Sequence, residues 1–142
     1  MSKDLELTVK KTIPASRKAV FQAWLDPKAL AQFMRPAEGM SVPKVENDPK
    51  VGGQFLIVMR AGEQDSEHRG EYKEISEYDK LVFTWESQMS EPGSLVTITF
   101  TEKGPNETEV ILHHAGSPSE ESRNDHEGGW GRIIDTLATH LT

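Results

Sequence analysis

Three of the five histidines lie where strand or helix periodicity turns the side chain inward. His114 shares a face with the apolar residues of one strand-like run, and His68 shares a face with Tyr72 in another. His126 belongs to the apolar stripe of a helical pattern near the C-terminus. Imidazoles that converge on one cavity could bind a divalent cation or transfer protons. The histidines are therefore the first candidates for chemistry.

These histidines lack the close ligand spacing of zinc sites, and the chain has no cysteine. We therefore expect no metal, no cofactor and no catalytic residue, and each imidazole then forms a local hydrogen bond at the rim of a cavity. The alternative is acid–base catalysis of the cyclase, dehydratase or hydrolase type, with Tyr72 or Glu74 assisting His68. Ile75 interrupts the alternation after Glu74, which predicts a bulge that turns Glu74 outward.

Aromatic side chains form the second candidate group, and they either line a ligand site or fill an ordinary core. Trp85 and Trp130 are the stronger lining candidates, because an indole N–H needs a hydrogen-bond partner when it is buried. Met34, Met59 and Met89 could supply an adaptable mouth. The complete set of predicted ligand-binding residues is Phe33, Met34, Phe55, His68, Tyr72, Trp85, His114, His126, Trp130 and Ile134.

The elements that must position these residues begin with a strand over 5–13, where apolar and polar residues alternate. Ser16 and Asp26 are the expected N-caps of two short helices, and Pro27 suits the first position of the second helix. Short strand-like runs separated by turn signals then continue to residue 115. The predicted strands are 41–47, 53–60, 67–77, 80–87, 93–102 and 107–115.

The last part of the chain predicts one long helix. Residues Ser117–Glu120 have the pattern of a capping box with proline at the first helical position. An apolar stripe that includes Trp130 follows at helical spacing. Gly128, Gly129 and Gly131 weaken the middle of this helix by roughly 1 kcal/mol each. They predict either a close contact with the helix backbone or a helix that flexes.

This order of elements predicts an α+β fold in which a seven-stranded curved antiparallel sheet wraps around the C-terminal helix. The two short helices lie between the first and second strands. A helix laid across a curved sheet leaves room for an apolar cavity, which is the usual form of a small-molecule site. The architecture therefore predicts a binding function independently of any motif.

The composition excludes several classes of function. Lys and Arg total 16 against 23 Asp and Glu, a net charge of −7 that disfavours nucleic acid and acidic membrane surfaces as partners. No apolar run reaches the roughly 20 residues that span a bilayer, and the N-terminus carries charges where a signal peptide is apolar. The motifs of serine hydrolases, phosphate-binding loops, dinucleotide sites and zinc proteases are missing. We expect a cytoplasmic protein.

The chain resembles the START-like superfamily, also called SRPBCC or Bet v-like, which has the helix-grip fold. Within it, the chain resembles the single-domain bacterial type of the heat shock protein 90 ATPase activator homologue family. The matching segments span nearly the whole chain and are Pro14–Ser16, Val20–Trp24, Asp26-Pro27, Asp48–Phe55, His68–Tyr72, Leu81–Trp85, Val96–Phe100 and Gly129-Trp130.

The resemblance implies a helix-grip fold and a single START-like domain over residues 1–142. Activation of the chaperone belongs to eukaryotic relatives with an additional N-terminal domain, and this chain begins directly at its first strand, so we expect no chaperone partner. Relatives of this kind are often homodimers, and a homodimer is allowed here. Met34 and Lys50 stand where relatives often carry tryptophan and arginine, which is expected to alter the cavity mouth and the charge contacts of one turn.

Three hypotheses about function follow. The leading one is a cytoplasmic protein that binds a hydrophobic or aromatic small molecule between the sheet and the C-terminal helix, with His68, Tyr72 and His114 orienting the ligand. The second is a small cyclase-, dehydratase- or hydrolase-type enzyme that uses a cavity histidine. The third is a protein-interaction module, including a chaperone-ATPase regulator, that acts through its acidic surface.

Overall fold

The computed structural model describes residues 5–35, 39–87, 94–117 and 119–141. Within these ranges, strands and helices follow one another in the predicted order. The elements are β1 (Leu5–Ile13), α1 (Arg17–Ala23), α2 (Pro27–Phe33), β2 (Met40–Asn47), β3 (Gln54–Ala61), β4 (Gln64–Ser76), β5 (Lys80–Thr84), β6 (Leu95–Gly104), β7 (Glu107–Ser117) and α3 (Glu120–His140).

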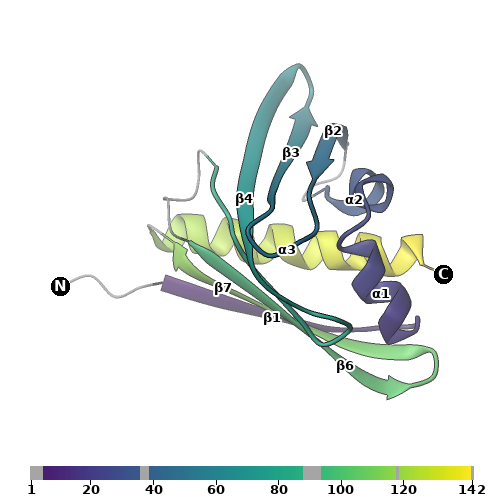
Figure 1. Ribbon diagram of the computed structural model, residues 1–142. Helices are drawn as coiled ribbons and strands as arrows, with labels where there is room; N and C mark the ends of the chain where they lie inside the picture. The colour runs from purple at the N-terminus through teal and green to yellow at the C-terminus, as the bar shows by residue number, and fades with distance from the viewer. Residues whose placement is uncertain (1–4, 36–38, 88–93, 118, 142) are drawn as a thin grey trace.

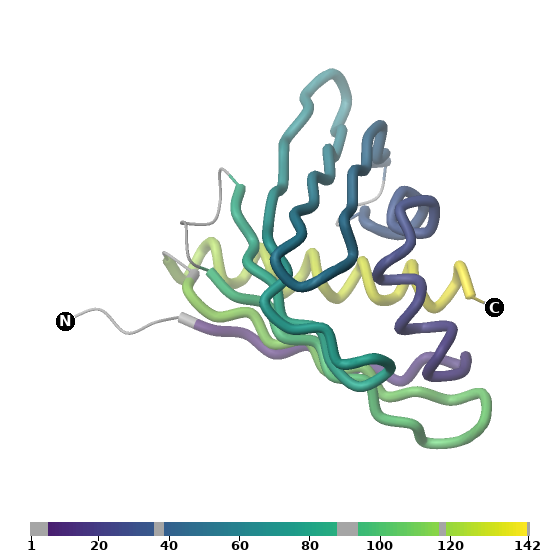
Figure 2. Tube along the Cα trace, in the orientation of Figure 1, coloured from purple at the N-terminus to yellow at the C-terminus, as the bar shows by residue number. Residues whose placement is uncertain are grey.

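The strands form one seven-stranded antiparallel sheet in the order β1-β7-β6-β5-β4-β3-β2. Figure 1 shows that this sheet curls around α3, with β1, β7 and β6 along one side of the helix and β2, β3 and β4 rising on another. The Cα trace in Figure 2 places α1 and α2 together, beside the C-terminal half of α3. The predicted helix-grip fold of the α+β class is confirmed.

β4 changes its partner along its length, which lets the sheet bend. Residues 64–71 pair with β3, whereas residues 72–76 pair with β5, and the register shifts between Tyr72 and Glu74. The bulge predicted beside Ile75 is therefore confirmed. Gly70 lies where the partner changes, and a Cβ on this residue would overlap the Thr84 carbonyl oxygen and the Phe55 ring. The close approach of these strands thus requires glycine.

α3 buries its apolar stripe against the concave side of the sheet. Trp130, Ile133, Ile134 and Leu137 are all buried, as their helical spacing predicts. On the outer side of the helix, an exposed ion pair joins Asp135 to Lys11 of β1, with 2.8 Å between Oδ1 and Nζ. None of the helices in the described ranges is long and apolar enough to cross a membrane.

Three predicted boundaries were wrong because tertiary pairing decides them. β4 begins at Gln64 rather than residue 67, since residues 64–67 pair with residues 58–61 of β3. β5 ends at Thr84 rather than residue 87, because the chain then pairs back with β4 through Glu86 and Arg69. The N-cap of α3 is Ser119, whose hydroxyl accepts the Ser122 N–H at 3.1 Å. The predicted cap at Ser117 instead ends β7.

The glycines of α3 do not share one explanation. Among the described residues, no atom outside the helix backbone lies within 4 Å of a Cβ placed on Gly128 or Gly131. The predicted close contact with the helix backbone is therefore wrong at these two positions. They face the open outer side of α3, beside Asp135 and Thr139. Gly129 differs, because it lines a pocket on the inner side.

Candidate functional site

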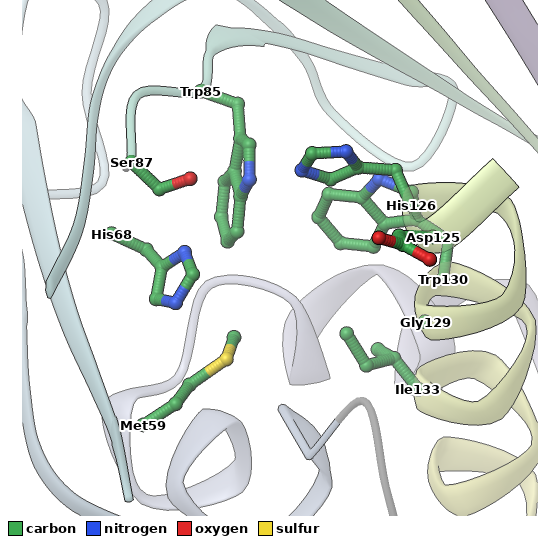
Figure 3. Close-up of a pocket in the computed structure, with 9 residues that line it drawn as sticks. All are labelled: Met59, His68, Trp85, Ser87, Asp125, His126, Gly129, Trp130 and Ile133. Atoms are coloured by element: carbon green, nitrogen blue, oxygen red, sulfur yellow. The ribbon is translucent and has the colours of Figure 1, made fainter. Parts of the chain in front are cut away.

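A pocket of about 100 Å³ lies between α3 and the region where β3, β4 and the end of β5 meet. Figure 3 shows Trp85 and His68 on one side of it, the side chains of α3 on the other, and Met59 below His68. For scale, an engineered apolar cavity of about 150 Å³ binds benzene. The described residues that line this outer pocket are Met59, His68, Trp85, Ser87, Asp125, His126, Gly129, Trp130 and Ile133.

Four of the predicted ligand-binding residues line the outer pocket: His68, Trp85, His126 and Trp130. Met59, predicted as a mouth residue, also lines it, whereas Met89 lies outside the described residues. Sequence reasoning did not single out the other lining residues as a site. The available signal was helix spacing: Asp125, Gly129 and Ile133 follow one another at intervals of four residues, as His126 and Trp130 do.

Another group of predicted residues surrounds a second, nearly filled space of about 10 Å³. We call its lining the inner cluster: Trp24, Leu30, Met34, Phe55, Ile57, Tyr72, Phe83 and Trp85. A space of this size is at the lower limit for a single water molecule. Trp85 is common to both sets and forms the wall between them. Phe33, His114 and Ile134 line neither space and are fully buried in the core.

A chain of hydrogen bonds behind the outer pocket joins its two tryptophans. The Trp130 indole Nε1–H donates to His114 Nδ1 at 3.0 Å. Because His114 Nδ1 accepts, the neutral imidazole carries its proton on Nε2 and donates it to Ser94 Oγ at 3.2 Å. The Ser94 hydroxyl donates in turn to the Trp85 carbonyl oxygen. The chain therefore fixes α3, β7 and the end of β5 relative to one another.

His114 is neutral at neutral pH. Burial, with smaller contributions from His126 and His113, lowers the pKa of His114 to about 3. A proton on Nδ1 would also oppose the incoming Trp130 N–H. His114 thus positions the pocket walls from behind.

His68 presents a lone pair that has no partner. Its ring stacks on Trp85, with centroids 5.1 Å apart and 27° between the planes. Nε2 lies 3.4 Å from Ser66 Oγ, which lies 3.5 Å from the Met59 carbonyl oxygen. Because a carbonyl only accepts, the hydroxyl donates to it and accepts from Nε2–H, leaving the lone pair on Nδ1. That buried atom has no hydrogen-bond partner among the described residues.

The charge state of His68 agrees with this assignment. Burial, with a smaller contribution from His126, lowers the pKa of His68 to about 4, so the imidazole is neutral at pH 7. The His68 ring that lines the pocket is therefore neutral rather than cationic at pH 7.

Trp85 carries a hydrogen-bond donor, its indole N–H, that also has no partner among the described residues. The residue is 2% exposed, and in the described part of the chain its buried Nε1–H has no hydrogen-bond acceptor. In Figure 3 the nitrogen edge of this indole faces the α3 side of the pocket. A buried polar group without a partner costs about 1–3 kcal/mol. Two side chains of the pocket lining, Trp85 and His68, thus each bury one polar atom that has no partner among the described residues.

The three candidate histidines do not form a metal centre. His126 meets His114 edge to face at 4.9 Å between ring centroids. Its Nδ1 lies 2.8 Å from the Ser122 carbonyl oxygen, so this nitrogen carries a proton and donates it. His114 Nδ1 already accepts from Trp130. In the described ranges, no group of three or more His, Cys, Asp or Glu residues is placed to hold a metal ion.

The groups proposed to assist His68 in acid–base chemistry point elsewhere. The Tyr72 hydroxyl donates to Asn47 Oδ1 at 2.7 Å, and burial raises the pKa of Tyr72. Glu74 accepts from the Ser76 hydroxyl at 2.9 Å and pairs with Lys80 at 3.7 Å. Neither Tyr72 nor Glu74 lines the outer pocket. Asp125 is the carboxylate found among the described lining residues.

The fold and this pocket define a helix-grip protein of the START-like class. The chain belongs to the family described as Activator of Hsp90 ATPase homolog 1-like protein, whose sequence profile matches residues 14–142. None of the curated proteins compared with the chain matches it.

Solved structures with the same fold come from several bacteria. A Chromobacterium violaceum protein is 24% identical with a TM-score of 0.85, over 96% of this chain and 97% of that one. The AHSA1 protein from Silicibacter pomeroyi is 26% identical with a TM-score of 0.81, over 96% of this chain and 97% of that one. The AHSA1-like protein from Aeromonas hydrophila is 21% identical with a TM-score of 0.83, over 96% of this chain and 92% of that one.

Proposed function

We propose that the protein binds a small hydrophobic or aromatic molecule in the outer pocket. The observation that carries this proposal is an apolar pocket whose walls hold two buried, unpartnered polar atoms, Trp85 Nε1 and His68 Nδ1. Apolar surface that leaves water contributes about 25 cal/mol per Å².

The walls of the pocket are held in place before a ligand arrives. The hydrogen-bonded chain through His114 and Ser94 fixes Trp130 and the backbone of Trp85. Stacking against His68 holds the Trp85 ring. A preorganised site loses less conformational freedom on binding, which favours affinity for a small ligand. In this proposal His114 therefore acts as a positioning residue.

Two neighbouring glycines of α3 offer a matched test. Gly129 lines the outer pocket, whereas Gly128 faces open space on the other side of the helix. Both Gly129→Leu and Gly128→Leu replace glycine by a strong helix former, so their effects on the helix itself are similar. We expect Gly129→Leu to fill the pocket and abolish binding of toluene and phenol, and Gly128→Leu to leave it unchanged.

The measurement is isothermal titration calorimetry, accompanied by native mass spectrometry of freshly purified protein for a retained small molecule. Equal binding by both variants would place the ligand elsewhere and overturn the assignment of the site. Absence of binding in the unmodified chain, together with a ligand-free mass, would overturn the proposed function. In this proposal, residues 1–142 act as one START-like unit in the cytoplasm without a cofactor or chaperone partner, and the same spectrum reports whether a homodimer forms.

A further inference from the structure

The two halves of α3 differ in how they are held against the rest of the fold. Residues 120–129 contain no hydrophobic side chain, and Ser122 is the one buried residue in this stretch of the described chain. The half that follows buries an apolar stripe made of Trp130, Ile133, Ile134 and Leu137. Most of the stability of a helix in a folded protein comes from packing of its apolar face. The N-terminal half of α3 is therefore weakly held.

This weakly held half covers one side of the outer pocket. Asp125, His126 and Gly129 are its part of the lining, and Figure 3 shows the side chains of α3 facing Trp85 and His68. The hydrogen bond from His126 Nδ1 goes to a carbonyl oxygen of the same helical half, at Ser122, and does not tie the half to the sheet. Unwinding of residues 120–129 would therefore uncover the pocket.

Both ends of this half are fixed, which determines how it can open. β7 pairs with β1 up to Ser117, just before the N-cap Ser119. At the other end, the bond from Trp130 to His114 holds the helix against β7. A segment fixed at both ends is not free to swing outward as a rigid helix. It opens by local unwinding, which proteins undergo most readily where few apolar contacts are buried.

Glycine lowers the cost of that unwinding. Among the described residues, no atom outside the helix backbone lies within 4 Å of a Cβ placed on Gly128, so packing does not require glycine there. Glycine favours the unwound chain relative to alanine, because it loses more conformational freedom when it becomes helical. Gly128 and Gly129 lie together at the end of the weakly held half, next to the anchored Trp130.

The closed pocket is small for an entering ring. Its volume of about 100 Å³ is below that of an engineered cavity of about 150 Å³ that binds benzene. Trp85 and Trp130 in its wall are each 2% exposed. A ligand with one aromatic ring would therefore enter more readily when part of the wall moves away.

We propose that residues 120–129 of α3 form a cover that unwinds as a unit and admits a ligand to the outer pocket. The rest of α3, from Trp130 onward, stays in place. The unwinding is a property of the helix itself, whereas its role in ligand entry rests on the proposed function.

Native-state hydrogen exchange of the full chain without ligand tests the unwinding. The amide hydrogens of residues 124–129 bond within the cover, whereas those of residues 134–137 bond within the anchored half. We expect the first group to share one protection factor, about tenfold or more below that of the second. Equal protection of the two groups would overturn the proposal. Protection that rises steadily from the N-terminus inward would show simple fraying and would overturn it as well.

Two variants connect the unwinding with ligand entry. Asn124 and Gly128 are exposed residues of the cover that do not line the pocket, and the double variant Asn124→Ala, Gly128→Ala strengthens its helix. We expect it to slow exchange within the cover, and both association and dissociation of toluene, about tenfold. Affinity should stay constant, because the cover is closed in the free and the bound protein alike.

The matched control is Thr136→Ala, which strengthens the anchored half of α3. That half stays helical when the cover opens, so exchange within the cover and both toluene rates should be the same as in the unmodified chain. NMR exchange spectroscopy with toluene measures the two rates. Association as fast in the double variant as in the unmodified chain would overturn the role of the cover. If the unmodified chain binds no toluene, the proposed function and this role fail together, while hydrogen exchange still decides whether the cover unwinds.

Discussion

The outer pocket and the inner cluster share one wall, Trp85, yet only the outer pocket has room for more than a water molecule. The inner cluster is lined throughout by large apolar side chains, and its Phe55 ring lies 5.5 Å from Tyr72 and 5.4 Å from Phe83 between centroids. The outer pocket has Ser87 and Gly129 among its lining residues. The same curled sheet therefore gives a packed core where every inward side chain is large, and a pocket where small residues replace two of them.

The two regions also differ in how their polar groups are used. In the inner cluster, the Tyr72 hydroxyl donates to Asn47, whose amide donates to the Leu25 carbonyl oxygen at 2.7 Å. In the outer pocket, His68 Nδ1 has no partner in the described chain. Satisfied polar groups are typical of structural core. The inner cluster nevertheless also holds Trp24 Nε1, which is buried without a partner among the described residues, so an unpartnered atom alone does not mark a ligand site.

The largest expected effect is that buried histidines beside and behind the outer pocket, and the buried tyrosine of the inner cluster, lower the stability of the whole domain at opposite ends of the pH range. The pKa values of His68 and His114, about 4 and 3, lie below the unfolded value of 6.5. The unfolded chain therefore binds more protons as pH falls below 6.5, and each histidine lowers the free energy of unfolding by about 1.4 kcal/mol per pH unit. The raised pKa of Tyr72 means that stability is lost as pH rises above 10.

Urea unfolding at a series of pH values measures both slopes. His68→Phe is expected to remove about half of the slope between pH 6.5 and 4.5, and to leave the alkaline slope unchanged. Tyr72→Phe is expected to reduce the alkaline slope and to leave the acid slope unchanged. An acid slope that survives in His68→Phe would contradict the buried, neutral state of His68.

The second effect compares two buried residues on one face of β3. Phe55→Ala leaves a cavity in the inner cluster and is expected to lower the free energy of unfolding by about 3–5 kcal/mol. Met59→Ala enlarges a pocket that already exists, so fewer packing contacts are lost and we expect about 2 kcal/mol. Chemical denaturation of both variants at pH 7 measures the difference. Equal losses would show that Met59 packs as tightly as Phe55.

Features of the fold that depend on interactions within one short segment could be predicted from the sequence. Features that depend on contacts between distant segments could not. Ser16 and Asp26 cap α1 and α2 as predicted, because an N-cap bonds within its own turn. The α3 cap was misplaced because Ser117 and Ser119 are both suitable, and pairing of Ser117 with Leu5 in β1 decides between them. The sequence around Ser117 does not indicate that this residue pairs with Leu5, because the two residues are far apart in the chain.

The candidate site likewise has features that depend on local pattern and features that depend on contacts between distant segments. Alternation within strands predicted that Trp85, His68 and His114 face inward, and all three do. It did not predict that His114 lies behind the pocket wall, bonded to Trp130. That contact joins β7 to α3 and depends on how the helix crosses the sheet.

The third effect compares the two indoles of the outer pocket. Trp130→Phe leaves His114 Nδ1 buried without its donor, which is expected to cost about 1–3 kcal/mol beyond the lost ring volume. Trp85→Phe removes an N–H that has no partner among the described residues, so its lost packing is partly offset by the relieved desolvation cost of about 1–3 kcal/mol. The difference between the two free energies of unfolding, measured in urea, therefore compares a hydrogen-bonded buried indole N–H with an unpartnered one. Equal costs would mean that the bond to His114 contributes little.

The smallest effect concerns the outer face of α3, where a side chain added at Gly128 would contact no other side chain among the described residues. Gly128→Ala adds a methyl group into open space within a helix and is expected to raise the free energy of unfolding by about 0.5–1 kcal/mol. Gly129→Ala has the same effect on helix propensity but extends into the outer pocket. Phenol affinity should therefore fall in Gly129→Ala and stay constant in Gly128→Ala. If both variants gain stability and bind phenol equally well, the ligand does not contact α3 at Gly129. Its ring would then lie nearer His68 than α3.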